Sequence, residues 1–196
     1  MTVHDFLPDD HLRQVQNIHD FAGMLVFDKW LCNTNGRQAV FFRQAASFRD
    51  ARQHADRFAR AVHAEASRLA SPAGSPSGGP DGVDIPYQAK MIDQGFCFNA
   101  GEWNYPDAPL RGLYARNRVY EGVTGMESFA PWIARVESLT ERTLGEFYGE
   151  VPLEWYEDDA DALYRLLEQL YRRRTRLPEL LLAAKNSSRQ PFPNWR

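Results

Sequence analysis

The residues from Phe27 to Phe42 constrain the fold more than any other part of this sequence. An apolar run ending in Trp30-Leu31 is followed by a cluster of turn formers, Asn33-Thr34-Asn35-Gly36, and then by aromatic and branched residues. Before the turn, apolar side chains recur at three- and four-residue steps, which is typical of a helix with a buried face. The sequence therefore predicts a helix at about residues 10–31 that delivers a polar turn to a strand at 38–43.

A second polar turn follows another predicted strand. Residues 87–92 are predicted to resume the fold as a short strand after the Ser/Pro/Gly-rich stretch, and Asp93-Gln94-Gly95-Phe96 comes directly after them. Gly95 would allow the backbone to turn sharply just beyond Asp93. Because Asp-x-Gly is a common turn sequence, a purely structural turn remains an alternative.

Length and composition favour one domain spanning residues 1–196. A chain of 196 residues with 43% hydrophobic residues can bury one sizeable core. After residue 110 the apolar spacing is helical, so the fold class is predicted to be α+β, mostly helical, with a few short strands that carry the polar turns. The expected helices are 111–122, 126–139, 141–148, 159–174 and 178–185, and the apolar tail 191–195 is expected to pack onto the body.

Residues 44–84 are interpreted as an insertion into this domain. They begin with an Ala- and Arg-rich stretch that favours a surface helix and continue into a Ser/Pro/Gly-rich stretch that favours a flexible loop. His54 and His63 are nine residues apart, which would place them on opposite sides of a helix. They are therefore not expected to share a metal ion.

Charge and cysteine content limit the cellular compartments and the partner classes that the sequence favours. The formal net charge of −3 gives no positive field for nucleic acid, and no apolar run is long enough for a membrane span. The first ten residues lack a signal-peptide pattern, and two cysteines fit a reduced protein, so a cytoplasmic location is expected. The basic run Arg172-Arg173-Arg174 is interpreted as the solvated end of a helix rather than a phosphate site.

Four ordered stretches together resemble the HipA-like kinase family, specifically its short branch. They are Asp5-Phe6-Leu7-Pro8, Phe27-Asp28-Lys29-Trp30, Asn33 to Phe41, and Met91-Ile92-Asp93-Gln94-Gly95-Phe96. The resemblance implies a protein-kinase-like C-terminal lobe that binds ATP and Mg²⁺. It also implies phosphoryl transfer to the hydroxyl of an unknown protein or small-molecule substrate.

The resemblance assigns roles to particular positions. The family's catalytic Asp falls on Asn35, and its metal-binding Asp falls on Asp93. Asn33 and Gly95 join Asp93 as expected nucleotide-binding residues. Asp28 and Lys29, in the last helical turn before the loop, are expected to orient it by hydrogen bonds.

Two further residues of the first turn receive roles by the same resemblance. The family's metal-binding Asn falls on Val40, and Gln38 is the nearest polar substitute as a metal ligand. Arg37 could neutralise a phosphate or pair with an acid. Arg37 and Gln38 are therefore included with Asn35 in the catalytic set.

Departures from the family pattern leave alternatives open. An amide such as that of Asn35 cannot accept a proton from a hydroxyl, and loss of a positioned base costs about 10²- to 10⁴-fold in rate. No Gly-rich loop or strand lysine of a nucleotide-covering lobe is evident, so such a lobe could be supplied by a separate partner. The main alternative is a non-catalytic, kinase-derived binding or scaffold protein, and the other is a helical domain in which both turns are only structural.

Overall fold

The structure is a computed structural model that describes residues 2–36, 38–43 and 86–196. The fold is α+β, with about half of these residues in helices, as the α+β prediction requires. Three strands form one antiparallel sheet in the order β1 (Thr2–His4), β2 (Ala39–Arg43) and β3 (Tyr87–Met91). The predicted insertion 44–84, with its two histidines, lies outside the described residues.

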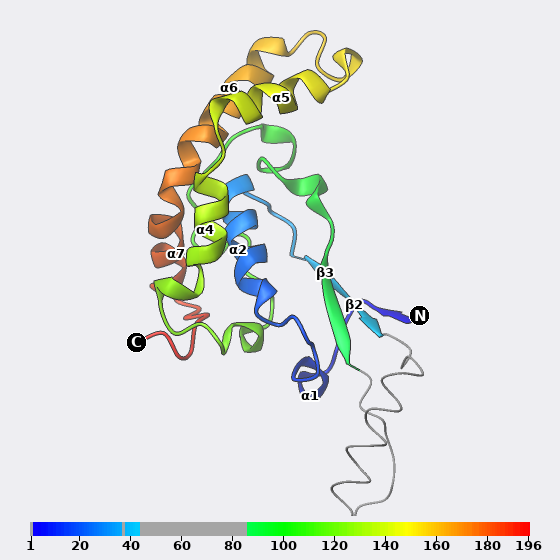
Figure 1. The fold of residues 1–196 in the computed structure, drawn as a ribbon, viewed down its shortest axis with the longest axis vertical. Coiled ribbons are helices and arrows are strands. Elements are labelled where there is room, and N and C mark those ends of the chain that lie inside the picture. Colours follow the sequence, from blue (N-terminus) through cyan, green and yellow to red (C-terminus); the bar gives the residue numbers. More distant parts are fainter. Residues whose placement is uncertain (1, 37, 44–85) are drawn as a thin grey trace, which may run out of the picture.

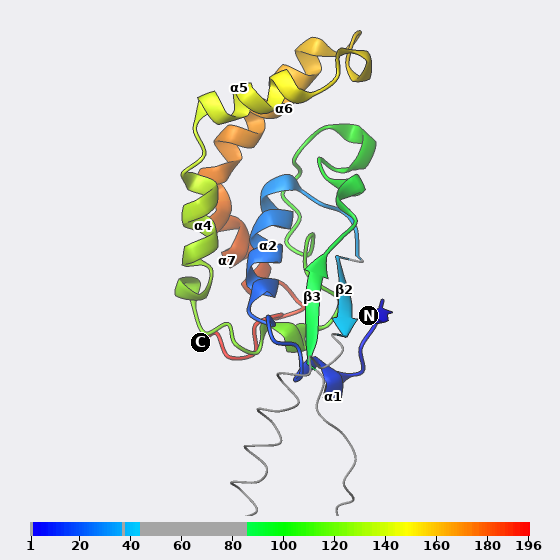
Figure 2. The same ribbon diagram turned by 45° about the vertical axis from the view of Figure 1, so that its right-hand side comes forward.

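Six α-helices lie within the described ranges, joined by short 3₁₀ turns. They are α1 (Asp9–Leu12), α2 (Asp20–Leu31), α4 (Ala130–Glu137), α5 (Glu141–Glu150), α6 (Ala160–Arg173) and α7 (Leu177–Lys185). The predicted helices from residue 126 onward are confirmed, with ends shifted by a few residues. Figures 1 and 2 show α2 between the sheet on one side and helices α4 and α7 on the other.

The helix predicted at 10–31 is wrong in its first half, because α1 and α2 are separate. Between them the backbone pairs with β3: the Gln16 N–H donates to the Tyr87 carbonyl at 2.9 Å, and the Tyr87 N–H donates to the Gln14 carbonyl at 3.1 Å. The Asn17 side chain bonds both the carbonyl and the N–H of Ala89, at 2.9 and 2.8 Å. These contacts replace helical hydrogen bonds and attach the helix start to the sheet.

The helix predicted at 111–122 is also wrong. This segment is an irregular loop with one 3₁₀ turn at Asn117–Tyr120, and Gly112 has a left-handed φ of 75°. Its polar groups find partners far along the chain: Arg189 donates to the carbonyl of Tyr114 at 2.9 Å and also to that of Ala115. These tertiary contacts, and not the apolar spacing that suggested a helix, determine the backbone conformation of this segment.

The core is built around α2. Phe21 and Leu25 of this helix are almost completely buried, together with Phe41 of β2 and Leu177 and Leu181 of α7. Residues from both ends of the chain thus share one apolar cluster.

The apolar tail packs back onto this body, as predicted. The Phe192 ring is buried, with its centroid 5.5 Å from that of Phe129 and 5.4 Å from that of Tyr120. By contrast, the hairpin of α5 and α6 extends beyond the ends of α2 and α4 in both views (Figures 1 and 2).

Within the described ranges, none of the helices combines the length and the apolar character that crossing a bilayer requires.

Candidate functional site

The two polar turns meet at one end of the β2–β3 pair. Ala39 lies opposite Met91, and the Ile92 N–H donates to the Gln38 carbonyl at 3.0 Å. Because the strands are antiparallel, the turn that precedes β2 and the turn that follows β3 lie at the same end of the sheet. Segments almost sixty residues apart in the sequence therefore become neighbours.

Hydrogen bonds join the two turns directly. The Thr34 N–H donates to the Phe96 carbonyl at 3.1 Å, and the Asn35 side-chain Nδ2 donates to the Asp93 carbonyl at 3.3 Å. Just beyond, the Phe98 N–H donates to the Leu31 carbonyl at 2.7 Å. Asn35, at the expected catalytic position, thus takes part in linking the turns.

Asn33 sets the shape of the first turn from inside the protein. Its side chain is completely buried, and its Nδ2 donates to Asp28 Oδ1 at 2.9 Å. Its Oδ1 accepts the Asn35 N–H at 3.0 Å, so both ends of the carboxamide are used. Asn33 was expected to bind the cofactor, but in the structure its side chain holds the backbone of Asn35 in place.

Asp28 is the buried carboxyl beneath this turn. Burial raises its pKa to about 7, while the hydrogen bond from Asn33, the nearby Gln38 amide and the charge of Lys29 oppose that rise. The bond to Asn33 confirms the expectation that Asp28 orients the turn. A protonated or partly protonated carboxyl near neutral pH follows from this environment.

Gln38 lies inside the protein beside Asp28. Its side chain is buried, and neither its Oε1 nor its Nε2 makes a hydrogen bond of ordinary geometry with a protein atom. Asp28 Oδ2 is also buried without such a hydrogen bond. The Gln38 amide therefore lowers the pKa of Asp28 through its proximity rather than through an aligned hydrogen bond.

The outer side of the junction holds Asp93 and Gly95, both exposed. The left-handed conformation is adopted by Asp93 itself, with a φ of 66°, and Gly95 follows within the 3₁₀ turn Gln94–Phe96. Arg37 lies outside the described residues. Across the described ranges, no three His, Cys, Asp or Glu side chains gather as metal ligands. Asp93 contributes an exposed carboxylate to this junction.

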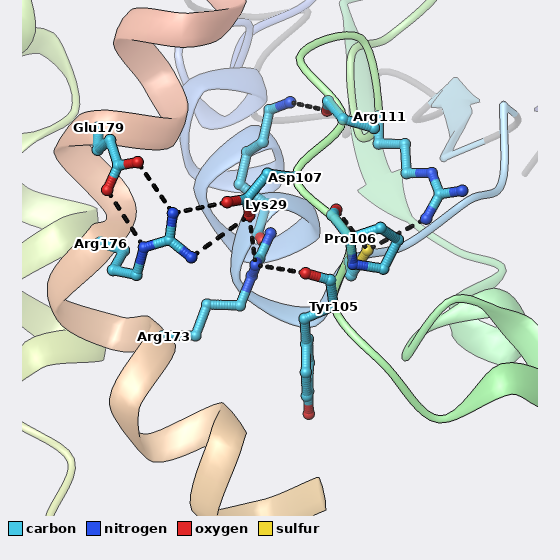
Figure 3. Close-up of polar contacts among 10 residues, drawn as sticks. Lys29, Tyr105, Pro106, Asp107, Arg111, Arg173, Arg176 and Glu179 are labelled. Carbon is cyan, nitrogen blue, oxygen red and sulfur yellow. Dashed lines mark hydrogen bonds and ion pairs between the residues drawn. The ribbon is translucent and has the colours of Figure 1, made fainter.

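Sequence reasoning missed a second polar network beneath the junction, shown in Figure 3. The buried Lys29 ammonium donates to the Pro109 carbonyl at 2.7 Å and to the Ala108 carbonyl at 3.2 Å. Burial, aided by the positive charge of Arg173, lowers the pKa of Lys29 to about 8. Lys29 therefore fixes the Pro-rich segment 106–109, whereas its expected role was to orient the loop.

Arg173 links three parts of the chain in this network. Its Nε donates to the Lys29 carbonyl at 2.9 Å, and its Nη1 donates to the Tyr105 carbonyl at 3.2 Å and to Asp107 Oδ1 at 3.1 Å. Burial would raise the pKa of Asp107, but hydrogen bonds from Arg176 and Arg173 outweigh it and lower that pKa. The prediction that the basic run at 172–174 is solvated is therefore wrong for Arg173, which is 5% exposed.

No protein-family model matches this chain, and no curated protein or solved structure shows significant similarity to it.

Proposed function

We propose that this chain is a HipA-like kinase lobe that binds a magnesium–nucleotide complex at the junction of its two turns and has lost phosphoryl transfer. The supporting observation is the hydrogen bond between Asn35 Nδ2 and the Asp93 carbonyl, which brings together the two positions that the resemblance assigns to catalysis and to the metal. Kinase-type sites need these two turns side by side. This is the kinase-derived binding protein among the alternatives raised by the sequence.

Loss of transfer follows from the side chains at the first turn. Asn35 presents an amide where a carboxylate must accept the proton of the attacking hydroxyl. Its Nδ2 is engaged with the second turn, which favours a structural role. Val40, at the position of the family's metal-binding Asn, is apolar and buried.

The residues present fit a magnesium ion only in part. Mg²⁺ is commonly bound by one or two protein carboxylates together with phosphate oxygens and waters, and the exposed Asp93 can supply one such carboxylate. When bound, the ion would neutralise phosphate charge. Gln38, the other expected metal ligand, supports Asp28 from inside the protein and leaves Asp93 as the protein ligand.

Calorimetry with ATP, with and without Mg²⁺, tests this proposal on the intact chain. Binding is expected only with Mg²⁺ present, and Asp93→Ala should weaken it at least about tenfold, because the carboxylate that would hold the ion is removed. Asp158→Ala, which removes an exposed carboxylate far from the junction, should leave the affinity unchanged.

The transfer half of the proposal is measured separately. Release or transfer of phosphate from labelled ATP should not exceed the background rate. Absence of binding at millimolar ATP, or equal binding by the wild type and Asp93→Ala, would refute the nucleotide site. Clear turnover abolished by Asp93→Ala would refute the loss of transfer.

A further inference from the structure

The α5–α6 hairpin contains a groove that the nucleotide proposal does not use. The groove has a volume of about 450 Å³ and lies between the two helices. Three tyrosine rings line it, Tyr148 from α5 and Tyr164 and Tyr171 from α6, together with the carboxylates of Glu141 and Glu168. Aromatic faces beside carboxylates form the kind of surface that binds organic cations.

Most of the hairpin is also strongly acidic. Residues 141–164 contain eight Asp or Glu residues and one basic residue, Arg142, a formal charge of −7 in a chain whose total is −3. Arg142 is itself paired with Glu146, at 3.0 Å. This part of the surface therefore attracts positively charged partners and repels phosphate-rich ones such as nucleic acids and anionic membranes.

Exposed apolar side chains are concentrated on the same hairpin. Four of the ten most exposed large apolar side chains in the described ranges belong to it: Phe147, Leu153, Trp155 and Tyr164. Tyr164 is 67% exposed although it lines the groove. Aromatic residues left exposed beside a groove are typical of surfaces that bind other proteins.

An arginine just outside the hairpin already packs against one ring of the groove. The Arg174 guanidinium lies 3.6 Å from the centroid of the Tyr171 ring, at one end of the groove. Tyr164, about two helical turns before Tyr171 on the same helix, offers a second ring to an incoming guanidinium.

We propose that the α5–α6 groove binds an arginine-rich segment of a partner protein, with a guanidinium stacked on Tyr164 and paired with Glu141, since Glu168 is already paired with Arg172 at 2.6 Å. A second copy of this chain is disfavoured as the occupant, because two copies of the acidic stretch 141–164, each of formal charge −7, would repel each other. The proposal is independent of nucleotide binding.

Fluorescence anisotropy with a labelled peptide of alternating arginine and alanine tests the proposal on the intact chain. The wild type should bind this peptide at low salt and should not bind the corresponding glutamate–alanine peptide. Tyr164→Ser, which changes no charge, should weaken binding about three- to tenfold, and Glu141→Gln should weaken it to a similar extent.

Two matched variants serve as controls. Asp10→Asn removes an exposed carboxylate on α1, and Leu182→Ser removes an exposed apolar side chain on α7; both should leave the affinity within about twofold. An equal loss of affinity in Asp10→Asn and Glu141→Gln would show that the peptide is attracted by overall charge and does not bind in the groove. An unchanged affinity in Tyr164→Ser would also overturn the proposal. So would sedimentation showing that Tyr164→Ser converts a dimer into a monomer, since the occupant would then be a second copy.

Discussion

The inner and outer sides of the turn junction contain the same residue types, Asp and Asn, which are buried on the inner side and at least partly exposed on the outer side. On the inner side, Asp28, Asn33 and Gln38 are buried. The Asn33 carboxamide donates to Asp28 Oδ1 and accepts a hydrogen bond from the Asn35 N–H. On the outer side, Asp93 is exposed and Asn35 is half-buried. Polar residues that look equivalent in the sequence therefore divide into those that build the turn and those that can meet a ligand.

The difference shows that burial, more than residue type, separates support from binding. A buried polar group must be satisfied by the protein, so its position is fixed and its removal is costly. An exposed carboxylate such as that of Asp93 is satisfied by water and can exchange that water for a ligand at little cost to the fold. Substitutions on the inner side should therefore change stability, whereas Asp93→Ala should change binding.

The largest effect on stability is expected for Arg173→Leu. This change removes the donor to the buried Lys29 carbonyl and the half-buried Tyr105 carbonyl, together with the partner of Asp107. The free energy of unfolding should fall by about 3 kcal/mol, measured by urea denaturation.

The adjacent arginine provides a matched control for this prediction. Arg172 is exposed and pairs with Glu168 on the helix surface, so Arg172→Leu should change the free energy of unfolding by less than about 0.5 kcal/mol. Equal losses in the two variants would mean that the inner network does not differ from the surface in its contribution to stability.

A somewhat smaller effect is expected from the titration of Asp28. Its pKa is raised from 3.8 to about 7 by burial, so between these values the folded state binds more protons than the unfolded state. The free energy of unfolding should therefore decrease as the pH rises, by about 2 kcal/mol from this group between pH 5 and pH 7. Urea denaturation at both pH values measures the difference.

Asp28→Asn isolates this contribution. The substituted amide keeps an oxygen for the bond from Asn33 and has no proton to lose, so the loss of stability between pH 5 and pH 7 should be smaller by about 2 kcal/mol. A pH dependence identical to that of the wild type would show that Asp28 is already ionised in the folded state at pH 5.

Much of the fold could be predicted because its signals are local. Apolar spacing located the second half of the helix at 10–31 and the helices after residue 126, and both strands that carry the turns were predicted next to their turn residues. The failures occur where distant partners decide the backbone: the Asn17 side chain pairs with β3, and Arg189 takes the carbonyls of residues 114 and 115. No periodicity within 13–19 or 111–122 could reveal those partners.

The site could be predicted in outline and not in its inner supports. The two turns were recognisable from their residues, and the charged pair Asp28-Lys29 within the apolar run from Phe27 to Leu31 was a usable signal of buried polar groups. Arg173 had no such signal, because it lies between two other arginines that are less buried. A run of like charges conceals the single member that a helix face directs inward.

The smallest effect, and the sharpest test of the division between the two sides, is expected for Asn35. Asn35→Ala removes the 3.3 Å bond from Nδ2 to the Asp93 carbonyl, which is near water, and should lower the free energy of unfolding by about 0.5 kcal/mol. Asn35→Asp not only removes this donor but also places a second carboxylate beside that carbonyl and near Asp93, so its loss should be about 1 kcal/mol. Urea denaturation of both variants in parallel measures the difference. If Asn35→Asp were more stable than Asn35→Ala, the residue would not link the turns as a donor, and the junction would be open to a carboxylate in the way that an active kinase requires.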